Sequence, residues 1–478
     1  MELSKDLASR QAVRNLVDEA DRAQRALREL DQGAIDRIVE AMSRVGADHA
    51  EELAREARSE TGFGNVADKT IKNRFAAQTL WKQIQNLPTI GILNRDETRK
   101  VWDIGVPVGV VAGIVPSTNP TSTVIYKSMI SLKAGNAIVF SPHPGARKCT
   151  VHAAKLMAQA AEGAGCPKGA IGCIESPSME AVEELMNYHK VRLILATGGG
   201  AMVRAAYSSG KPAIGVGAGN GPSYLHPSCD IRQAVAHIVR SKTFDNGTVC
   251  ASEQSIIAHR NHAAAVEAEL QRQGCCILPE EDARRLARYL FRENGTMNPK
   301  IVGKPASEIA QLAGLSAEAV QARVLVAREN GVGKKFPYSM EKLCPVLGYY
   351  VVEDENEALA RACEVLEHEG SGHTFSIHTT EEAVVKRFAE RVPVSRFLVN
   401  TPAALGGIGA TTGLFPALTL GCGAVGGSSS SNNIGPLDLI NIRRVAWGLQ
   451  EQTNRRPSVE DDLVEQLTRR LMEKIMKS

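Results

Sequence analysis

The residue with the most direct chemical potential is Cys250, which stands in the segment FDNGTVCASEQ. The pattern predicts a helix that ends near Ser241 and a strand soon after the cysteine, so Cys250 falls on a turn between two elements. A cysteine there can aim its sulfur and its own backbone N–H at a carbonyl group, which favours nucleophilic attack. A buried structural thiol is the alternative role for every one of the ten cysteines. Position alone does not single out Cys250.

Asn119 is the second candidate, in the segment IVPSTNPTS at the end of an apolar run. Pro116 and Pro120 flank it and restrict the backbone of the loop. A carboxamide N–H held there is suited to donate a hydrogen bond to an oxyanion. Asn is equally common in turns, so the residue type leaves both interpretations open.

Two other motifs fail in their context. The glycines of GCGAVG at 421–426 fit a dinucleotide-binding pattern, but Ser and Asn residues follow where that pattern needs a helix. His368, Glu369 and His373 approximate a zinc-protease motif, with a spacing one residue too long and with glycines that oppose a helix. The sequence therefore predicts no metal site.

The elements that must position these residues follow an alternating pattern. The first 95 residues are helical in pattern, with apolar residues three and four positions apart. From Trp102, five apolar strands alternate with helix-like stretches, which predicts a parallel sheet with helices on both faces. The alternation restarts after Pro222 and continues to Val399, which predicts a second α/β domain.

Two segments follow that belong to neither predicted core. LDLINIRRVAWGL reads as an isolated strand, which is typical of an arm that pairs with another subunit. Ser458 is placed to cap an 18-residue helix whose apolar stripe lies on one side. The stripe consists of Val464, Leu467, Leu471 and Ile475. This helix either docks on its own subunit or binds something else.

The composition narrows the function classes. The chain has 478 residues, 56 Lys and Arg against 53 Asp and Glu, and a net charge of +3, which gives no electrostatic reason to expect nucleic acid binding. The ten cysteines include no C-x-x-C pair, which fits neither a disulfide framework nor a zinc site. The charged N-terminus and the short apolar runs predict a cytoplasmic protein without a membrane span.

Six segments together carry a family resemblance, in their order and at about their usual distances. They are IVPSTNPTS, ATGGGAMVRAA, GVGAGNGP, FDNGTVCASEQ, EKLCPVLGYY and TLGCGAVGGSSSSNNIGPLDLINIRRV. In these the chain resembles the aldehyde dehydrogenase superfamily, and in detail its CoA-acylating branch, which includes acetaldehyde and propionaldehyde dehydrogenases. The resemblance runs from the N-terminal helices to about residue 450.

The resemblance implies an α/β aldehyde dehydrogenase fold with several parts. A Rossmann-like nucleotide-binding domain is expected over 1–95 and 107–225, and a catalytic cysteine domain over 226–430. An oligomerisation arm is expected over 96–106 and 431–450, followed by a linker and C-terminal amphipathic helix over 451–478.

The resemblance also implies roles for particular residues. Cys250 matches the catalytic nucleophile and Asn119 the side-chain half of the oxyanion hole. The residues that match the cofactor-binding positions are Pro116, Ser117, Thr118, Ser141, Pro142, His143, Thr197, Gly198, Gly199 and Glu341. His373 resembles a recurrent histidine of the acylating branch, for which CoA contact and a structural hydrogen bond remain alternatives.

One departure from the hydrolytic relatives bears on the reaction. Alignment on Pro222 places Val216 where those relatives carry a glutamate general base. A thioester on Cys250 would then persist until a thiol arrived, and coenzyme A supplies one. The implied reaction is reversible conversion of a short-chain aldehyde, CoA and NAD into acyl-CoA and NADH. A hydrolytic or phosphorylating dehydrogenase, and a non-catalytic shell-binding protein on the same fold, are the alternatives.

Cofactor, substrate and partners are less constrained. NAD is implied by the family, but SPHPGARK has no acid after its strand, and Arg147 or Lys148 is compatible with NADP. Acetaldehyde, propionaldehyde, sulfoacetaldehyde and longer aldehydes all stay open. The resemblance implies a homodimer or homotetramer, and the C-terminal helix is compatible with placement inside a bacterial microcompartment.

Overall fold

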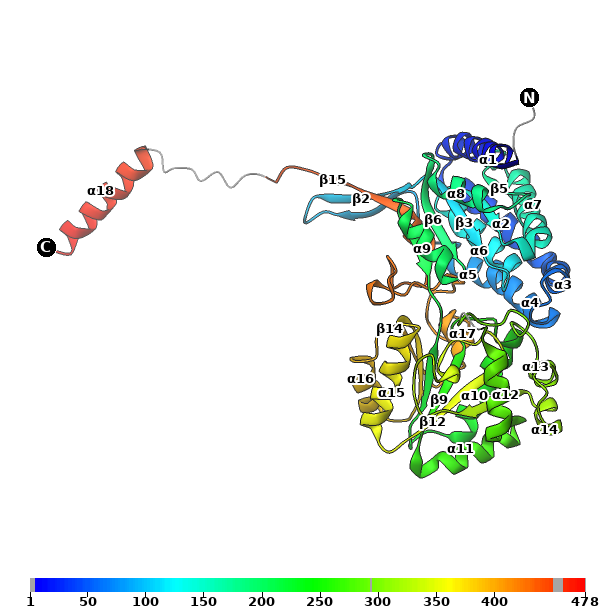
Figure 1. The fold of residues 1–478 in the computed structure, drawn as a ribbon. Helices are drawn as coiled ribbons and strands as arrows, with labels where there is room; N and C mark the ends of the chain where they lie inside the picture. Colours follow the sequence, from blue (N-terminus) through cyan, green and yellow to red (C-terminus); the bar gives the residue numbers. More distant parts are fainter. Residues whose placement is uncertain (1–4, 293–294, 450–458, 478) are drawn as a thin grey trace. The chain divides into compact units, whose positions relative to one another are not determined.

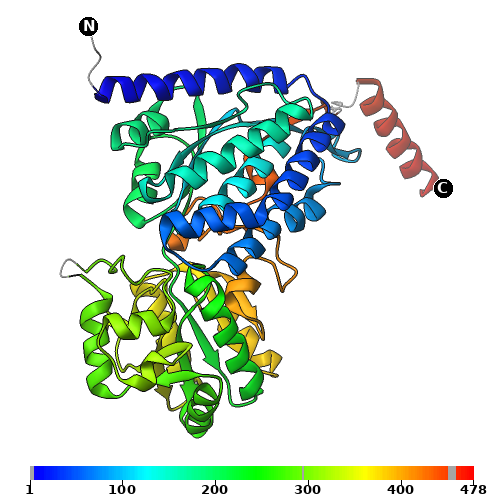
Figure 2. The same cartoon turned by 90° about the vertical axis from the view of Figure 1, so that its right-hand side faces the viewer.

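The computed structural model describes residues 5–292, 295–449 and 459–477. The chain divides into two units. The first unit comprises Met1–Ile90 and Val106–Asn441, and the second comprises Gly91–Gly105 and Ile442–Ser478. Figure 1 labels the elements of both, and Figure 2 gives a second view.

A five-stranded parallel sheet forms the first layer of the larger unit. Its order is β5-β4-β3-β6-β7. The strands are β3 (Val110–Val115), β4 (Ala137–Pro142), β5 (Ile171–Cys173), β6 (Val191–Thr197) and β7 (Ala213–Val216). Every residue of β3 and β4 is buried, as expected for strands covered on both faces. The predicted parallel sheet is confirmed.

Helices cover this sheet (Figures 1 and 2). They are α1 (Lys5–Leu27), α2 (Gln32–Asp48), α3 (Ala50–Thr61), α4 (Val66–Arg74), α5 (Leu80–Ile84), α6 (Pro120–Lys133), α7 (Arg147–Gly163), α8 (Met179–Asn187) and α9 (Gly200–Ser208), with a π-helical turn at Phe75–Thr79. α6 packs on α7, and α1 packs on α8. α6 is buried along its whole length, so its first residues are held firmly behind the ends of the strands.

The expectation of helix throughout the first 95 residues is wrong at its end. The helices stop at Ile84, and β1 (Gly91–Asp96) begins at Gly91, whose φ is +77°. Pro88 cannot continue a helix. The N–H groups of Thr89 and Ile90 instead donate to Gln32 Oε1 at 2.9 and 3.1 Å.

The second layer of the larger unit is a seven-stranded parallel sheet. Its order is β10-β11-β12-β9-β8-β13-β14. The strands are β8 (Gly221–Leu225), β9 (Glu253–His259), β10 (Cys275–Ile277), β11 (Val324–Arg328), β12 (Val346–Val352), β13 (Gly372–His378) and β14 (Val394–Val399). The helices of this part are α10 (Ile231–Thr243), α11 (Arg260–Arg272), α12 (Glu280–Leu290), α13 (Ala306–Leu312), α14 (Ala317–Val320), α15 (Glu355–His368), α16 (Glu382–Ala389) and α17 (Ala403–Gly407). β8 belongs to this sheet, although the expected domain boundary after residue 225 assigned it to the first.

The smaller unit contains a three-stranded sheet with the order β1-β2-β15. β2 spans Val101–Pro107 and pairs antiparallel with β1, while β15 spans Ile440–Ala446, as the isolated strand pattern predicts. The Trp102 and Trp447 rings meet edge to face with centroids 4.7 Å apart. The β1–β2 pairing was not part of the sequence expectation for this arm.

The smaller unit also contains α18 (Val459–Ile475), which confirms the predicted C-terminal helix. The proposed N-cap residue Ser458 lies outside the described residues. The apolar residues of α18 are more than half exposed, from 52% at Leu467 to 65% at Ile475. Across the described part of the chain, every helix is too short or too polar to cross a bilayer.

Candidate active site

The positions expected to bind the cofactor gather where the five-stranded sheet reverses its strand order. The chain places β4 and β5 on one side of β3, then β6 and β7 on the other. The register sets Val115 beside Pro142 and Ile114 beside Ala196, so the carboxyl ends of β4, β3 and β6 are neighbours. Ligands of open α/β sheets bind in the crevice at this kind of reversal. The positions gathered there are Pro116, Ser117, Thr118, Ser141, Pro142, His143, Thr197, Gly198 and Gly199.

The crevice behind these residues is braced by Lys127 of α6. Its buried ammonium donates to Ile114 O of β3 at 2.7 Å and to Leu195 O of β6 at 2.9 Å. Burial lowers the pKa of Lys127 to about 7. The side chain therefore joins the two strands at the reversal point.

The helices that follow β6 and β4 begin in different ways. Gly199 is the N-cap of α9, is exposed, and has open space around the position of an added Cβ. At α7, Glu60 accepts from the N–H groups of Lys148 and Cys149, each at 2.8 Å. Free N–H groups at a helix start suit phosphate, so of the two helices only α9 has a start that is open to an anion.

Cys250 lies just before β9, and its backbone is pressed against Gly219. An added Cβ at Gly219 would lie 1.9 Å from the Cys250 carbonyl oxygen, so only glycine fits this approach. The Gly219 N–H donates to Glu341 Oε1 at 2.8 Å. The structure therefore brings Cys250 and Glu341, which are far apart in sequence, to the same glycine.

The thiol of Cys250 is not ionised by its surroundings. Burial raises its pKa to about 12, Glu341 and Cys422 act in the same direction, and Arg396 acts against them. Burial likewise raises the pKa of Glu341 to about 8, with a further contribution from Glu369. Because the thiolate is the reactive form, attack requires that a proton first leaves this site.

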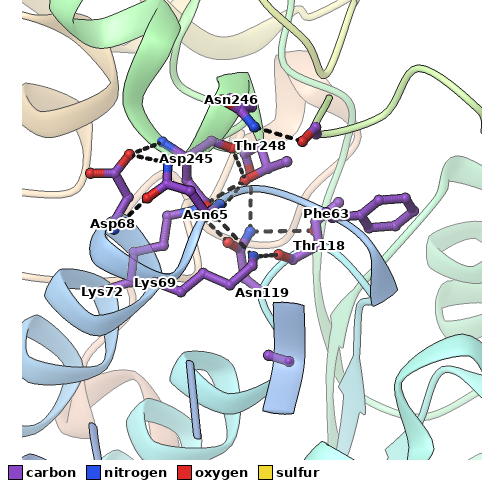
Figure 3. A network of polar contacts seen from close by, with 12 residues as sticks. Phe63, Asn65, Asp68, Lys69, Lys72, Thr118, Asn119, Asp245, Asn246 and Thr248 are labelled. Carbon is purple, nitrogen blue, oxygen red and sulfur yellow. Dashed lines mark hydrogen bonds and ion pairs between the residues drawn. The ribbon is translucent and has the colours of Figure 1, made fainter. Parts of the chain in front are cut away.

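Asn119 lies at the start of α6, with its side chain turned toward the turn before Cys250 (Figure 3). Its Nδ2 donates to Thr248 O at 3.0 Å and to Thr118 Oγ1 at 3.3 Å. Its Oδ1 accepts from Lys72 Nζ at 2.6 Å. The amide therefore presents its donors on the side of the segment that ends in Cys250.

Val216 and His373 are both buried. Val216 ends β7 and is 4% exposed, so an apolar side chain fills the position of the absent glutamate. His373 lies on β13, and its Nδ1 is 2.9 Å from Thr374 Oγ1. Burial lowers the pKa of His373 to about 3, which keeps the ring neutral. Its Nε2 has no hydrogen-bond partner among the described residues.

The described residues contain one group with metal-ligand geometry, formed by Glu52, Glu56 and His152. It lies on α3 and α7, and His152 Nδ1 is 2.8 Å from Glu56 Oε2. These side chains are partly or fully solvent-exposed, and they contain none of the residues expected at the catalytic or cofactor positions.

Sequence reasoning missed the buried charges that hold the site. Lys69 and Lys72 of α4 contact Asp245, and Lys242 donates to Gln254 Oε1 at 2.9 Å and to Lys342 O at 3.0 Å beside Glu341. In the sequence these residues look like the charged side of ordinary helices. The two consecutive left-handed residues at 245 and 246 carry the only local signal, the pair Asp-Asn before Gly, which favours such a turn.

Known proteins share this architecture. The sequence profile of the aldehyde dehydrogenase family matches residues 4–274. The bifunctional aldehyde-alcohol dehydrogenase of Escherichia coli K12 is 43% identical over 436 residues, which is 90% of this chain and 49% of that protein. The chain thus spans about half the length of this curated relative.

Three solved structures cover nearly the whole chain. An acetylating aldehyde dehydrogenase from Geobacillus thermoglucosidasius is 50% identical, with a TM-score of 0.92 over 94% of this chain and 99% of that one. A propionaldehyde dehydrogenase from a fucose utilisation microcompartment of Clostridium phytofermentans is 26% identical, with a TM-score of 0.83 over 92% and 98%. A Rhodopseudomonas palustris propionaldehyde dehydrogenase with bound CoA and an acylated cysteine is 28% identical, with a TM-score of 0.82 over 91% and 97%. The chain belongs to the aldehyde dehydrogenase family.

Proposed function

We propose that this protein is a CoA-acylating aldehyde dehydrogenase, which oxidises a short-chain aldehyde and passes the acyl group to coenzyme A. The observation that carries the proposal is the Asn119 amide directed at the turn that ends in Cys250. A nucleophile and an oxyanion donor on one turn suit attack on an aldehyde carbonyl. The acetylating relative and the relative with CoA and an acylated cysteine support the same assignment.

The first step is attack of the Cys250 thiolate on the aldehyde carbon, after the thiol has released its proton to water. The carbonyl oxygen becomes an oxyanion, which the Cys250 N–H and the Asn119 Nδ2 are placed to stabilise. The Asn119 N–H that contacts Thr118 Oγ1 at 3.3 Å makes the weaker of its two bonds and is the more available donor. The product of this step is a hemithioacetal on Cys250.

The second step removes hydride from the hemithioacetal and leaves a thioester. The ends of β3, β4 and β6 would hold a nicotinamide nucleotide, which would supply the hydride acceptor. The start of α9 suits its phosphates, and Glu341 suits its ribose. The start of α9 fits such a ligand because Gly199 leaves open space beside its backbone.

The third step is transfer of the acyl group to the sulfur of CoA, which frees the Cys250 thiolate. Val216 supplies no base to activate water, so hydrolysis is not assisted from that position. One thioester replaces another, so this exchange is nearly thermoneutral and the overall reaction runs in both directions. A hydrolytic or phosphorylating reaction is the alternative within the same family.

An assay with and without CoA separates these reactions. Reduced nucleotide is followed by absorbance and the products by mass spectrometry, with Cys250→Ala as the control for uncatalysed oxidation. We expect acyl-CoA and sustained turnover only with CoA, and no turnover with Cys250→Ala. Equal turnover without CoA, with free carboxylic acid as the product, would contradict the proposal. A panel of acetaldehyde, propionaldehyde, sulfoacetaldehyde and longer aldehydes then identifies the substrate.

For the nucleotide we propose NAD, with NADP as the alternative. Arg147 and Lys148 favour a 2′-phosphate, whereas Glu60 places a carboxylate at the same helix start. A carboxylate accepts from a ribose hydroxyl and repels a phosphate. The ratio of kcat/KM for the two nucleotides decides between them, and a ratio above one for NADP over NAD would reverse the assignment.

We also propose that α18 directs the protein to the inner face of a protein shell. The exposed apolar stripe of α18 supports this, as does the relative from a microcompartment. The test uses the full chain with the double change Leu467→Glu and Leu471→Glu, expressed with shell proteins. We expect loss of co-purification with shells, while Arg469→Glu, on the opposite side of the helix, retains it. If the double variant instead lost activity or subunit assembly while its shell association stayed unchanged, α18 would dock on the enzyme itself.

The three-stranded sheet of the smaller unit is our proposed contact with a second copy of the chain. Apolar side chains stay exposed there, among them Ile442 at 48% and Trp447 at 45%. We expect a dimer or tetramer by mass photometry and dissociation on Trp447→Glu. A monomeric wild-type protein would refute this assignment.

A further inference from the structure

A buried cluster of charges lies beneath the catalytic turn (Figure 3). Lys69 and Lys72 project from α4, and both contact Asp245 Oδ2, at 3.0 and 2.6 Å. The side chain of Asp245 is 0% exposed, and those of the two lysines are 4% and 3% exposed. Residues three apart on a helix share one side, so α4 presents two cations to one carboxylate.

Such a cluster is costly, because removing charges from water is only partly offset by pairing. Burial lowers the pKa of Lys72 to about 8 despite the attraction of Asp245. The arrangement is nevertheless fully hydrogen-bonded at Lys72. Its three N–H donors face Asn119 Oδ1 at 2.6 Å, Asp245 Oδ2 at 2.6 Å and Thr248 Oγ1 at 3.1 Å.

Lys72 determines which way the Asn119 amide points. An ammonium group only donates, so the amide must turn its oxygen toward Lys72. The Asn119 NH₂ group then faces Thr248 O and Thr118 Oγ1. The reversed rotamer would bring two donors together and lose the contact with Lys72. The orientation needed for an oxyanion donor is therefore enforced from the opposite end of the amide.

The same cluster holds the strained turn before Cys250. Asp245, Asn246 and Gly247 have φ values of +48°, +53° and +76°, a region that the two non-glycine residues rarely adopt. The Asp245 carboxylate accepts from the Asn65 N–H at 2.9 Å and from Thr248 Oγ1 at 2.7 Å. Contacts on both oxygens fix the carboxylate, and through it the turn.

We propose that Lys72, with Asp245 as its counter-ion, is a positioning residue that orients the Asn119 amide for the attack on the aldehyde. The inference rests on the proposed role of Asn119 as the oxyanion donor. Lys72 itself contacts no reacting atom. Lys69 provides a matched comparison, because it shares Asp245 but donates to Thr118 O at 2.9 Å rather than to Asn119.

A double-mutant cycle tests this coupling in the full-length enzyme. Turnover with saturating aldehyde, CoA and nucleotide is compared for wild type, Lys72→Met, Asn119→Ala and the double variant. We expect Asn119→Ala to lower kcat by about 10² to 10³ and Lys72→Met by at least about tenfold. In the Asn119→Ala background, Lys72→Met should cost less than about threefold, since its effect acts through the amide.

Lys69→Met is the control in the same cycle. It removes an equally buried lysine from the same carboxylate, so a general loss of stability would appear in both variants. We expect its effect on kcat to be smaller and to multiply with that of Asn119→Ala. If Lys72→Met does not fold, Lys72→Arg replaces it, and whatever loss it causes must likewise vanish when Asn119 is Ala.

The outcomes separate this inference from the proposed function. A large loss in Asn119→Ala together with a multiplicative effect of Lys72→Met would overturn the coupling and leave the oxyanion role intact. A loss below about threefold in Asn119→Ala would overturn both. An unchanged kcat in Lys72→Met would overturn the inference alone.

Discussion

The two parts of the proposed active site differ in the contacts that form them. The proposed nucleotide crevice at the ends of β3, β4 and β6 includes two glycines, and the start of α9 at Gly199 is open. The turn that carries Cys250 is held by buried charges, with Asp245 contacted by two lysines. A surface that admits a large ligand needs space and donors, whereas a turn that aims one sulfur and one amide needs fixed contacts. Substitutions in the two regions should therefore fail in different ways.

The largest effect is expected from Asp245→Ala, which leaves two buried ammonium groups without their carboxylate. Breaking a buried pair in this way costs about 3–5 kcal/mol of folding stability. A clear fall in the thermal unfolding midpoint should appear by calorimetry, while removal of the exposed carboxylate in Asp48→Ala should change it little. Equal midpoints for the two variants would show that the turn does not depend on the charge cluster.

Asn119→Ala comes next and should act on chemistry. Loss of one oxyanion donor lowers kcat by about 10² to 10³, with a small effect on the KM for nucleotide. Steady-state kinetics, with each substrate varied in turn, separates the effect on kcat from the effect on KM. An increase in nucleotide KM at unchanged kcat would assign Asn119 to the crevice rather than to the turn.

An effect of intermediate size is expected on the rate at which Cys250 is alkylated at different pH values. With the pKa of Cys250 raised to about 12 by burial, the thiolate fraction rises about tenfold per pH unit below that value. Alkylation by iodoacetamide in the absence of nucleotide should therefore accelerate about tenfold from pH 7 to 8 and again to 9. The reactive site is identified by peptide mapping, with Cys250→Ala as the background. A plateau before pH 9 would mean a much more acidic thiol.

Glu341→Gln sharpens the same measurement. The ionised Glu341 carboxylate helps to raise the pKa of Cys250, so Glu341→Gln should speed alkylation at pH 9, above the Glu341 pKa of about 8, and change it little at pH 7. Slower alkylation would contradict the electrostatic relation between the two residues.

The smallest effect is expected from Gly199→Ala in the crevice. The added methyl enters open space, so folding should be preserved, while closer approach of phosphate to the α9 N–H groups is hindered. The KM for nucleotide should rise about threefold with kcat unchanged, as for lost uniform binding. Gly219→Ala is the counterpart, because its methyl would lie 1.9 Å from Cys250 O and should abolish activity. Similar kinetics for both variants would contradict the claim that the crevice tolerates substitution better than the Cys250 turn.

The same distinction explains what the sequence allows one to predict. α8 (Met179–Asn187) is one of the helix-like stretches between the apolar strands, and the parallel sheet follows from the continuous apolar character of those strands. These signals are local, because burial on a strand or helix imposes a period. The resemblance supplies the expected role of the crevice residues, and these local signals place them at strand ends.

The buried charges could not be predicted in this way. Lys72 and Asp245 are 173 positions apart, and each looks like a solvated residue beside its own neighbours. β8 was assigned to the wrong sheet because a strand of GPSYL gives no sign of its partners, which are β9 and β13. The ion pair of Lys72 and the strand partners of β8 both depend on contacts between distant parts of the chain. A single sequence does not directly record such contacts.

The Lys127 ammonium links carbonyl oxygens of the neighbouring strands β3 and β6 near their carboxyl ends. Because both acceptors belong to the backbone, this link does not depend on which side chains line the crevice. In the proposed mechanism, nucleotide and CoA therefore exchange beside a pair of strands whose spacing stays fixed, so little ordering entropy is lost at each exchange.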